Sequence, residues 1–218
     1  DNPVLLPEAI KVGIINQSFC LKAAVEGGKS YFLQRINHNI FQDVEGLQNN
    51  IDRVTSHIRQ LLTEAGEADV ERKVLRVVPT KDGKLYYRTP EGEYWRIYVL
   101  IENALSYERI DAQSAFLAGQ AFGNFQCQLA SIDTDTLVES IPHFHDLAFR
   151  IEQLHEALDK DAAGRKAATQ DIVDFLLQRA EDMCLAEQLY AEGKLVKRVN
   201  HCDTKVNNML FDQQGNPM

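Results

Sequence analysis

The chain has 218 residues, enough for one large or two small domains, and its 44% hydrophobic and 25% charged residues are ordinary for a globular protein. The net charge of −9 disfavours general nucleic-acid binding, because nucleic-acid-binding proteins usually present a basic face. No apolar run approaches the roughly 18–20 residues that a membrane span needs, and the N-terminus lacks a signal-peptide pattern. We therefore expect partners other than nucleic acid or membrane, although a locally basic site could still bind a nucleotide.

The first hundred residues alternate like a sheet. We expect strands at 11–15 and 18–25, and the Gly-Gly pair within 26–29 predicts a hairpin that leads into a strand at 30–36. The hydrophobic period then changes to that of a helix, which we expect to begin at an N-cap near Asp43 and to end at Gly66. Its apolar face carries Val44, Leu47, Ile51, Val54, Ile58 and Leu61.

Further strands are expected at 73–79, 85–88 and 94–101, separated by Gly-containing turns at 81–84 and 89–92. About five strands joined mostly by hairpins predict a mainly antiparallel sheet. With the helices that follow, the fold class is α+β.

The rest of the chain is mainly helical. An expected long helix over 169–192 is stopped by Gly193, and a strand-like stretch at 195–199 leads to a polar loop at 200–208. Two earlier apolar stripes predict helices, the second entered through Pro142: Ala115, Ala118, Phe122, Phe125 and Leu129, then Leu147, Ile151, Leu154 and Leu158. We therefore predict a β-rich lobe over residues 1–102 and a helical lobe over residues 103–218.

Four cysteines are spread widely, with no CxxC pair or Cys/His cluster that would suggest zinc: Cys20, Cys127, Cys184 and Cys202. Four reduced thiols are typical of the cytoplasm, where we expect the protein.

The loop at 200–208 carries the candidate chemistry, because it fits His-x-Asp-x-x-x-x-Asn. In phosphoryl transfer, Asp203 would take or orient the hydroxyl proton of the acceptor, and Asn208 would give an amide oxygen to Mg²⁺. Lys205 could reach the transferred phosphate, and His201 would brace the loop by hydrogen bonds. A polar turn between two strands also favours such residues, but a β-rich lobe followed by helices favours the kinase interpretation.

A family resemblance is carried by YFLQRINHNIF at 31–41 and HCDTKVNNMLFD at 201–212, with support from WRIY at 95–98, IPHFHD at 141–146 and Arg150. Together they resemble bacterial N-acetylhexosamine 1-kinases, of the aminoglycoside phosphotransferase and choline kinase-like superfamily. The resemblance implies a protein-kinase-like two-lobe fold, ATP and Mg²⁺ as cofactors, and phosphorylation of the anomeric hydroxyl of an N-acetylhexosamine.

The resemblance also implies roles for other residues. Gly13, Asn16 and Ser18 would lie in a nucleotide-phosphate loop, and the backbone around Glu102 would form an inter-lobe hinge that holds adenine. A lone glycine in a hairpin is otherwise only a turn.

His145 and Arg150 would lie near the sugar pocket, and the Asp203 carboxylate would also contact the sugar. The alternative reading of His145 and Asp146 is the solvated polar face of a helix start.

The sequence departs from the family at the strand lysine that contacts the α- and β-phosphates. Gln34 occupies that position and Arg35 follows it, and only one of the two can point into the cleft because strand side chains alternate. Either could contact phosphates. The helix carboxylate that would pair with the cation is Glu45 or Asp52.

The family's second metal-binding aspartate would lie beyond Met218, as would much of the acceptor pocket. We expect the 218-residue piece to be inactive by itself and to leave an apolar surface uncovered.

Two other functions remain open. One is a related kinase acting on choline, homoserine or an aminoglycoside, since cationic acceptors suit an acidic pocket. The other is a non-catalytic binding protein on the kinase fold, with which Gln34 at the lysine position would agree.

Overall fold

The computed structural model describes residues 3–10, 13 and 15–218. The chain forms two compact units, Asp1–Ser140 with Arg198–Met218, and Ile141–Lys197, which are described separately here. None of the helices in the described ranges is long and apolar enough to cross a membrane.

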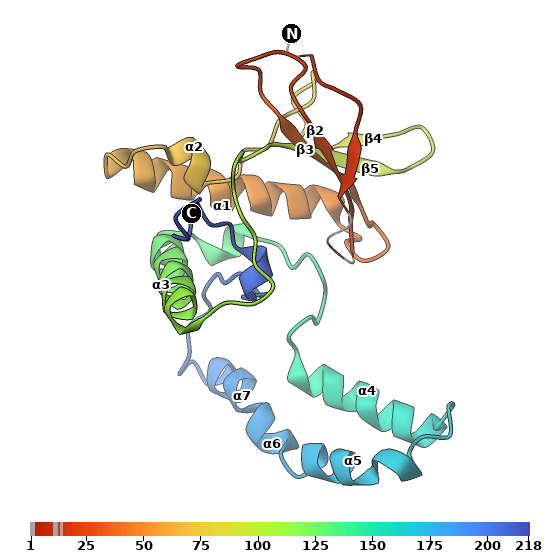
Figure 1. Cartoon of the computed structure of the whole chain (residues 1–218). Helices are drawn as coiled ribbons and strands as arrows, with labels where there is room; N and C mark the ends of the chain where they lie inside the picture. The colour runs from red at the N-terminus through yellow and green to blue at the C-terminus, as the bar shows by residue number, and fades with distance from the viewer. Residues whose placement is uncertain (1–2, 11–12, 14) are drawn as a thin grey trace. The chain divides into compact units, whose positions relative to one another are not determined.

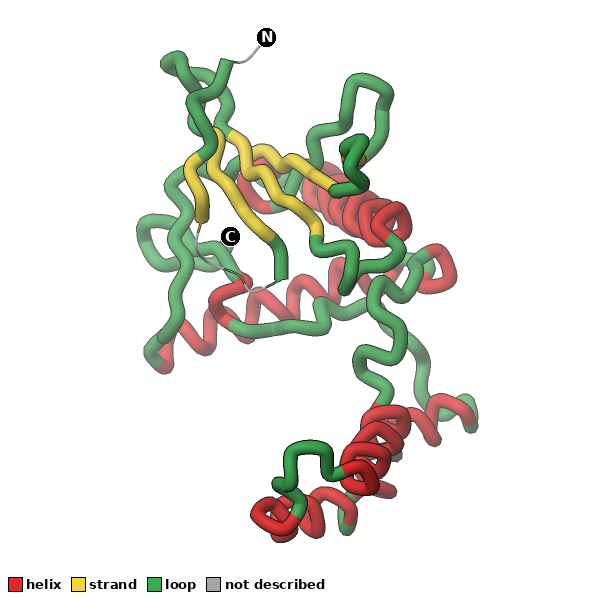
Figure 2. Tube along the Cα trace, turned by 90° about the vertical axis from the view of Figure 1, so that its right-hand side faces the viewer, coloured by secondary structure: helices red, strands yellow, loops and turns green. Residues whose placement is uncertain are grey.

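The first unit contains a five-stranded antiparallel sheet (Figure 2). Its strands are β1 (Glu8–Ile10), β2 (Gln17–Leu21), β3 (Tyr31–Ile36), β4 (Tyr87–Arg88) and β5 (Tyr94–Val99). They lie in the order β1-β2-β3-β5-β4, so every pair except β3 with β5 is adjacent in the chain. The predicted antiparallel sheet and the α+β class are confirmed.

Two strand predictions differ from the structure. The expected strand at 11–15 lies partly outside the described residues, and β1 precedes it. The expected strand at 73–79 is wrong, because its start belongs to α2 (Val70–Lys73) and only Val77 forms an isolated bridge, to Tyr98. The segment still lies beside β5, with hydrogen bonds from Val78 N–H to Ile97 O and from Val99 N–H to Arg76 O, while the Val74 side chain is buried in a cluster with Ile58.

Helix α1 (Val44–Glu64) runs along one side of the sheet (Figure 1). Asp43 caps it as predicted, since its Oδ1 accepts a hydrogen bond of 2.8 Å from the backbone N–H of Gly46. Gly66, with φ of 72°, follows its last turn. Ile58 on α1 packs against Val74 and Leu129, which forms one of the two cores of this unit.

The second core lies where α3 (Ala112–Gln128) meets the end of the chain. Ala118, Met209 and Phe211 are its buried residues, and Phe211 has no exposed surface. Three short 3₁₀ segments complete the unit, at Leu129–Ser131, Thr134–Thr136 and Val206–Asn208.

The second unit is helical, with α4 (Leu147–Lys160), α5 (Gln170–Leu177), α6 (Ala180–Met183) and α7 (Leu185–Ala191), and a 3₁₀ turn at Ala167–Thr169. The single helix predicted over 169–192 is therefore wrong, although Gly193 does stop the last segment, with φ of 72°.

The first break lies at Arg179. Its guanidinium donates to the Phe175 carbonyl, which would otherwise receive the Arg179 N–H, and that N–H bonds to Leu176 O instead. The stretch expected to be strand-like at 195–199 is irregular.

Candidate active site

The loop after Asn200 is shaped by its own side chains. The Asn200 Oδ1 accepts a hydrogen bond of 2.8 Å from the Cys202 N–H. Cys202 has φ of 61°, a left-handed conformation that is uncommon outside glycine, asparagine and aspartate. This turn precedes Asp203 directly and sets the direction in which the loop continues.

The structure brings together three of the predicted residues, which we call the loop cluster: Asp203, Lys205 and Asn208. The Asp203 Oδ2 lies 2.9 Å from the Lys205 Nζ and accepts a hydrogen bond of 2.8 Å from the Asn208 Nδ2. The same Nδ2 also donates to the Asp203 carbonyl at 2.9 Å. These contacts, first that of Lys205 and then that of Asn208, lower the pKa of Asp203. The carboxylate is therefore ionised near neutral pH and ready to accept a hydrogen bond from a hydroxyl.

The residues after the loop cluster anchor it to the second core. Phe211 and Leu105 exchange backbone hydrogen bonds of 2.8 and 2.9 Å, and the Phe211 ring lies 4.9 Å from that of Tyr107. The buried side chains of Met209 and Phe211 fix the chain beyond Asn208. An exposed loop thereby starts and ends at defined positions.

His201 lies against α3, with its ring centroid 6.0 Å from that of Phe122 and 6.1 Å from that of Phe125, both in edge geometry. These ring contacts support a bracing role for His201 that rests on packing.

The predicted nucleotide-phosphate loop is described only in part, since residue 14 lies outside the described residues. Gly13 has φ of 109°, which a side chain would strain. The Asn16 Oδ1 accepts a hydrogen bond of 3.0 Å from the Asn37 N–H, which ties this loop to the end of β3. Ser18 is buried on β2. Asn16 and Ser18 thus hold the loop, and their contact with a nucleotide stays a prediction.

The strand register shows to which face of the sheet the Gln34 and Arg35 side chains project. Gln34 is paired with Ser18 and Arg96, on the face that α1 covers. Arg35 points to the opposite face and forms an ion pair of 3.3 Å with Glu93.

Two residues on the α1 side of the sheet, Gln48 and Arg96, are absent from the residues that the sequence predicts for the site. The α1 side chain that reaches this face is Gln48, rather than Glu45 or Asp52, and it bonds to Arg96. The available signal was a charged residue inside the otherwise aromatic and aliphatic β5.

In the predicted hinge, the backbone carbonyls of Glu102 and Asn103 both accept hydrogen bonds from side chains. The Arg72 Nη1 donates to Glu102 O at 2.9 Å, and the Gln213 Nε2 donates to Asn103 O at 2.8 Å. The Glu102 side chain accepts a hydrogen bond of 2.6 Å from the Ser30 Oγ. An adenine base that used either carbonyl would share it with these side chains or displace them.

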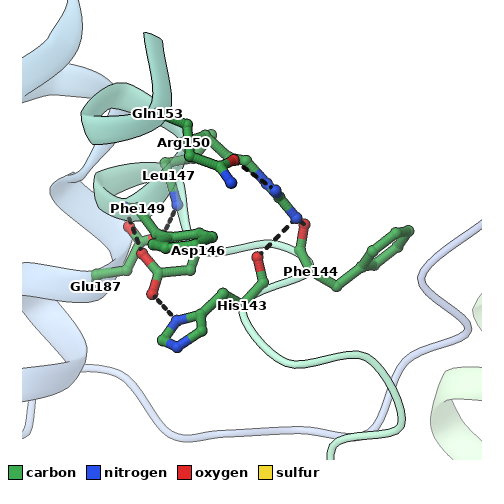
Figure 3. Close-up of polar contacts among 8 residues, drawn as sticks. All are labelled: His143, Phe144, Asp146, Leu147, Phe149, Arg150, Gln153 and Glu187. Atoms are coloured by element: carbon green, nitrogen blue, oxygen red, sulfur yellow. Dashed lines mark hydrogen bonds and ion pairs between the residues drawn. The ribbon is translucent and has the colours of Figure 1, made fainter. Parts of the chain in front are cut away.

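Figure 3 shows the residues around the start of α4 in the second unit. Asp146 caps the helix through a hydrogen bond of 2.9 Å from the Phe149 N–H and lies 2.7 Å from the His143 Nδ1. The same two contacts, in this order of importance, lower the pKa of Asp146. The Arg150 Nη2 donates to the carbonyls of His143 and Phe144, at 3.0 and 3.4 Å. These bonds explain Asp146 and Arg150 as residues that fold the helix start.

The His145 ring lies 4.6 Å from that of Phe144. The proposed contacts of His145 and Arg150 with a sugar stay predictions.

The side-chain donors of the chain limit which metal ion it could bind. No group of three His, Cys, Asp or Glu side chains that could hold an ion is found in the described part of the chain. Asn208 gives its Nδ2 to Asp203, which leaves its Oδ1 as an oxygen donor of the kind that Mg²⁺ prefers. The residues present fit an ion that takes its remaining ligands from phosphate and water.

An apolar cavity of about 470 Å³ opens on the sheet face opposite to Gln34. Leu33, Trp95 and Ile97 line it together with residues of the 78–89 segment. Arg96 also lines it, whereas none of the site residues predicted from the sequence does.

Comparisons with known proteins identify a family and a fold for the chain. The model of a family described as "Phosphotransferase enzyme family" matches residues 8–218. Among solved structures, the chain is similar to spectinomycin phosphotransferase in complex with ADP and spectinomycin, with a TM-score of 0.57 and 13% identity. The match covers 98% of this chain and 62% of that enzyme, and at this identity it shows the fold alone.

Proposed function

The chain belongs to the phosphotransferase enzyme family, and on this premise we propose that it is the ATP-binding part of a small-molecule kinase. The acceptor we propose is an N-acetylhexosamine, phosphorylated at its anomeric hydroxyl. The observation that carries the proposal is the convergence of Asp203, Lys205 and Asn208 within one loop whose two ends are packed. The sugar itself rests on the family resemblance of the 31–41 and 201–212 stretches.

In this proposal each member of the loop cluster has its own task. Asp203, whose ionised form Lys205 and Asn208 stabilise, accepts the hydrogen bond of the attacking hydroxyl and takes its proton. Lys205 holds the carboxylate in place and presents positive charge to the transferred phosphoryl group. Asn208 would hold Mg²⁺, which supplies charge neutralisation on the phosphates when bound.

An aminoglycoside is the second candidate acceptor, and the structural neighbour favours it. That neighbour is a spectinomycin phosphotransferase crystallised with ADP and its acceptor. The net charge of −9 is compatible with a cationic acceptor. Choline and homoserine are further acceptor classes within the same chemistry. We also propose the cytoplasm as the compartment, because Cys20, Cys127 and Cys184 are thiols and not disulfides.

The experiment that tests the function uses the full-length protein with ATP, Mg²⁺ and a panel of N-acetylhexosamines, amino alcohols, homoserine and aminoglycosides. Phosphorus NMR identifies the product. A sugar 1-phosphate from N-acetylglucosamine or N-acetylgalactosamine supports the proposal, and an aminoglycoside phosphate supports the second candidate. Nucleotide binding without transfer to any acceptor would identify a non-catalytic binding protein and contradict both.

A further inference from the structure

Three polar side chains from neighbouring strands meet on the sheet face that α1 covers. The antiparallel register places Gln34 of β3 opposite Ser18 of β2 and opposite Arg96 of β5. Residues directly opposite one another in an antiparallel sheet project to the same face. Arg35, paired with Trp95, projects to the other face. Arg96 is thus the cation of β5 that lies beside the position where the family has its phosphate-binding lysine.

Two amide side chains hold the Arg96 guanidinium. Its Nε donates to the Gln34 Oε1 at 3.0 Å and its Nη1 donates to the Gln48 Oε1 at 2.9 Å. Each amide is fixed at its other end, since the Gln34 Nε2 donates to the Ser18 Oγ and the Gln48 Nε2 donates to the Leu85 carbonyl, both at 2.9 Å. We call these residues, Ser18, Gln34, Gln48 and Arg96, the sheet cluster.

The sheet cluster leaves a positive charge without a negative partner. Gln48 is fully buried and Arg96 is partly buried, with its guanidinium 5.2 Å from the centroid of the Tyr98 ring. Within residues 3–10, 13 and 15–218, Arg96 forms no ion pair with a carboxylate. A partly desolvated cation that only neutral amides hold is unfavourable unless an anion approaches it. Two of its five N–H donors are used by the amides, and the fork geometry of guanidinium suits phosphate oxygens.

We propose that Arg96 binds the phosphates of the nucleotide, in place of the lysine that related kinases carry on β3, and that Gln34 and Gln48 position it. This inference rests on the proposed function, because it assumes that the protein binds a nucleotide. In related kinases the phosphate-binding cation is on β3, whereas here it is Arg96 on β5. Gln34, which occupies the lysine position on β3, orients the Arg96 guanidinium. The helix residue that orients it is likewise an amide, Gln48, whose Oε1 accepts a hydrogen bond from the Arg96 Nη1.

The test measures nucleotide binding by isothermal titration calorimetry on the full-length protein, with ADP and adenosine as probes and no acceptor present. Arg96→Gln should weaken ADP binding about 10-fold to 100-fold, the loss expected for charge-assisted hydrogen bonds, and should leave adenosine binding unchanged. The matched control is Arg53→Gln, which removes an exposed cation of α1 that lies outside the sheet cluster and should change neither affinity. Equal losses for ADP and adenosine would assign Arg96 a structural role and overturn the inference.

A double variant covers the case in which Arg96→Gln does not fold. Combining Gln34→Lys with Arg96→Gln restores one cation and one amide, now exchanged between the two strands. This variant should recover the preference for ADP over adenosine, and its folding without that preference would overturn the inference. If the wild-type protein binds ADP through Arg96 but phosphorylates no acceptor, the proposed function fails while this inference stands.

Discussion

The loop cluster and the sheet cluster are two polar groups built in opposite ways. Asp203, Lys205 and Asn208 lie within six residues of one another, and the Lys205 and Asp203 side chains are 55% and 53% exposed. The sheet cluster draws its members from β2, β3, β5 and α1, and Gln48 has no exposed surface. A cluster that is local in sequence depends on one loop conformation, whereas a cluster assembled across elements depends on strand register and on where a helix packs.

The largest effect is expected from a substitution at the centre of the loop cluster. Asp203→Asn keeps the size of the side chain but removes the base, so turnover should fall by about 10²-fold to 10⁴-fold. Steady-state kinetics of the full-length protein would measure this, together with ADP affinity, which should not change. Asp82→Asn, in the exposed 81–84 turn, is the control and should retain full activity. Near-complete activity of Asp203→Asn would reject Asp203 as the base.

The next effect concerns the packing that anchors the loop cluster. Phe211→Ala empties a fully buried site and should lower the free energy of unfolding by about 3–5 kcal/mol, measured by urea denaturation. Phe116→Ala is a matched control on α3, because that ring is 68% exposed and should cost little. Equal losses for the two variants would show that Phe211 does not anchor the chain beyond the loop.

A smaller effect tests the helix that supplies Gln48 to the sheet cluster. Asp43→Ala removes the N-cap of α1 and should lower the free energy of unfolding by about 1 kcal/mol. Asp52→Ala removes an exposed carboxylate from the middle of the same helix and serves as the comparison. Thermal unfolding that ranks Asp52→Ala as the more damaging variant would contradict the capping role.

The smallest effect is a displacement of a pH profile. The Lys205 ammonium favours the ionised form of Asp203, so Lys205→Met should raise the pKa of that carboxyl toward its ordinary value. Activity that needs the ionised carboxylate is lost as the pH falls through its pKa. The acid limb of kcat/KM should therefore lie at higher pH in the variant than in the wild type. If the acid limb of kcat/KM stayed at the same pH, Lys205 would have no electrostatic effect on Asp203.

The two clusters also differ in what the sequence could predict. The sequence predicts the loop cluster because its three residues have fixed spacings. Its contacts follow from one turn and one 3₁₀ segment. The sequence does not predict the sheet cluster, because either Gln34 or Arg35 could face α1 until the pairing of β3 with β5 is known. Glu45 and Asp52 were chosen for their charge, whereas packing decided that Gln48 faces the sheet.

Sequence patterns alone predict the antiparallel sheet, the bounds of α1 between Asp43 and Gly66, and the motif around Asp203. These features depend on local signals, namely hairpin turns, hydrophobic periods, caps and residue spacing. Contacts between distant parts of the chain are needed to see that Arg96 meets Gln48 and that Phe211 pairs with Leu105. They also decide that the 73–79 segment joins β5 through one isolated bridge instead of a strand, and that the 169–192 helix breaks at Arg179. Such outcomes depend on contacts between residues far apart in the chain or on competition for a single carbonyl, which periodicity does not encode.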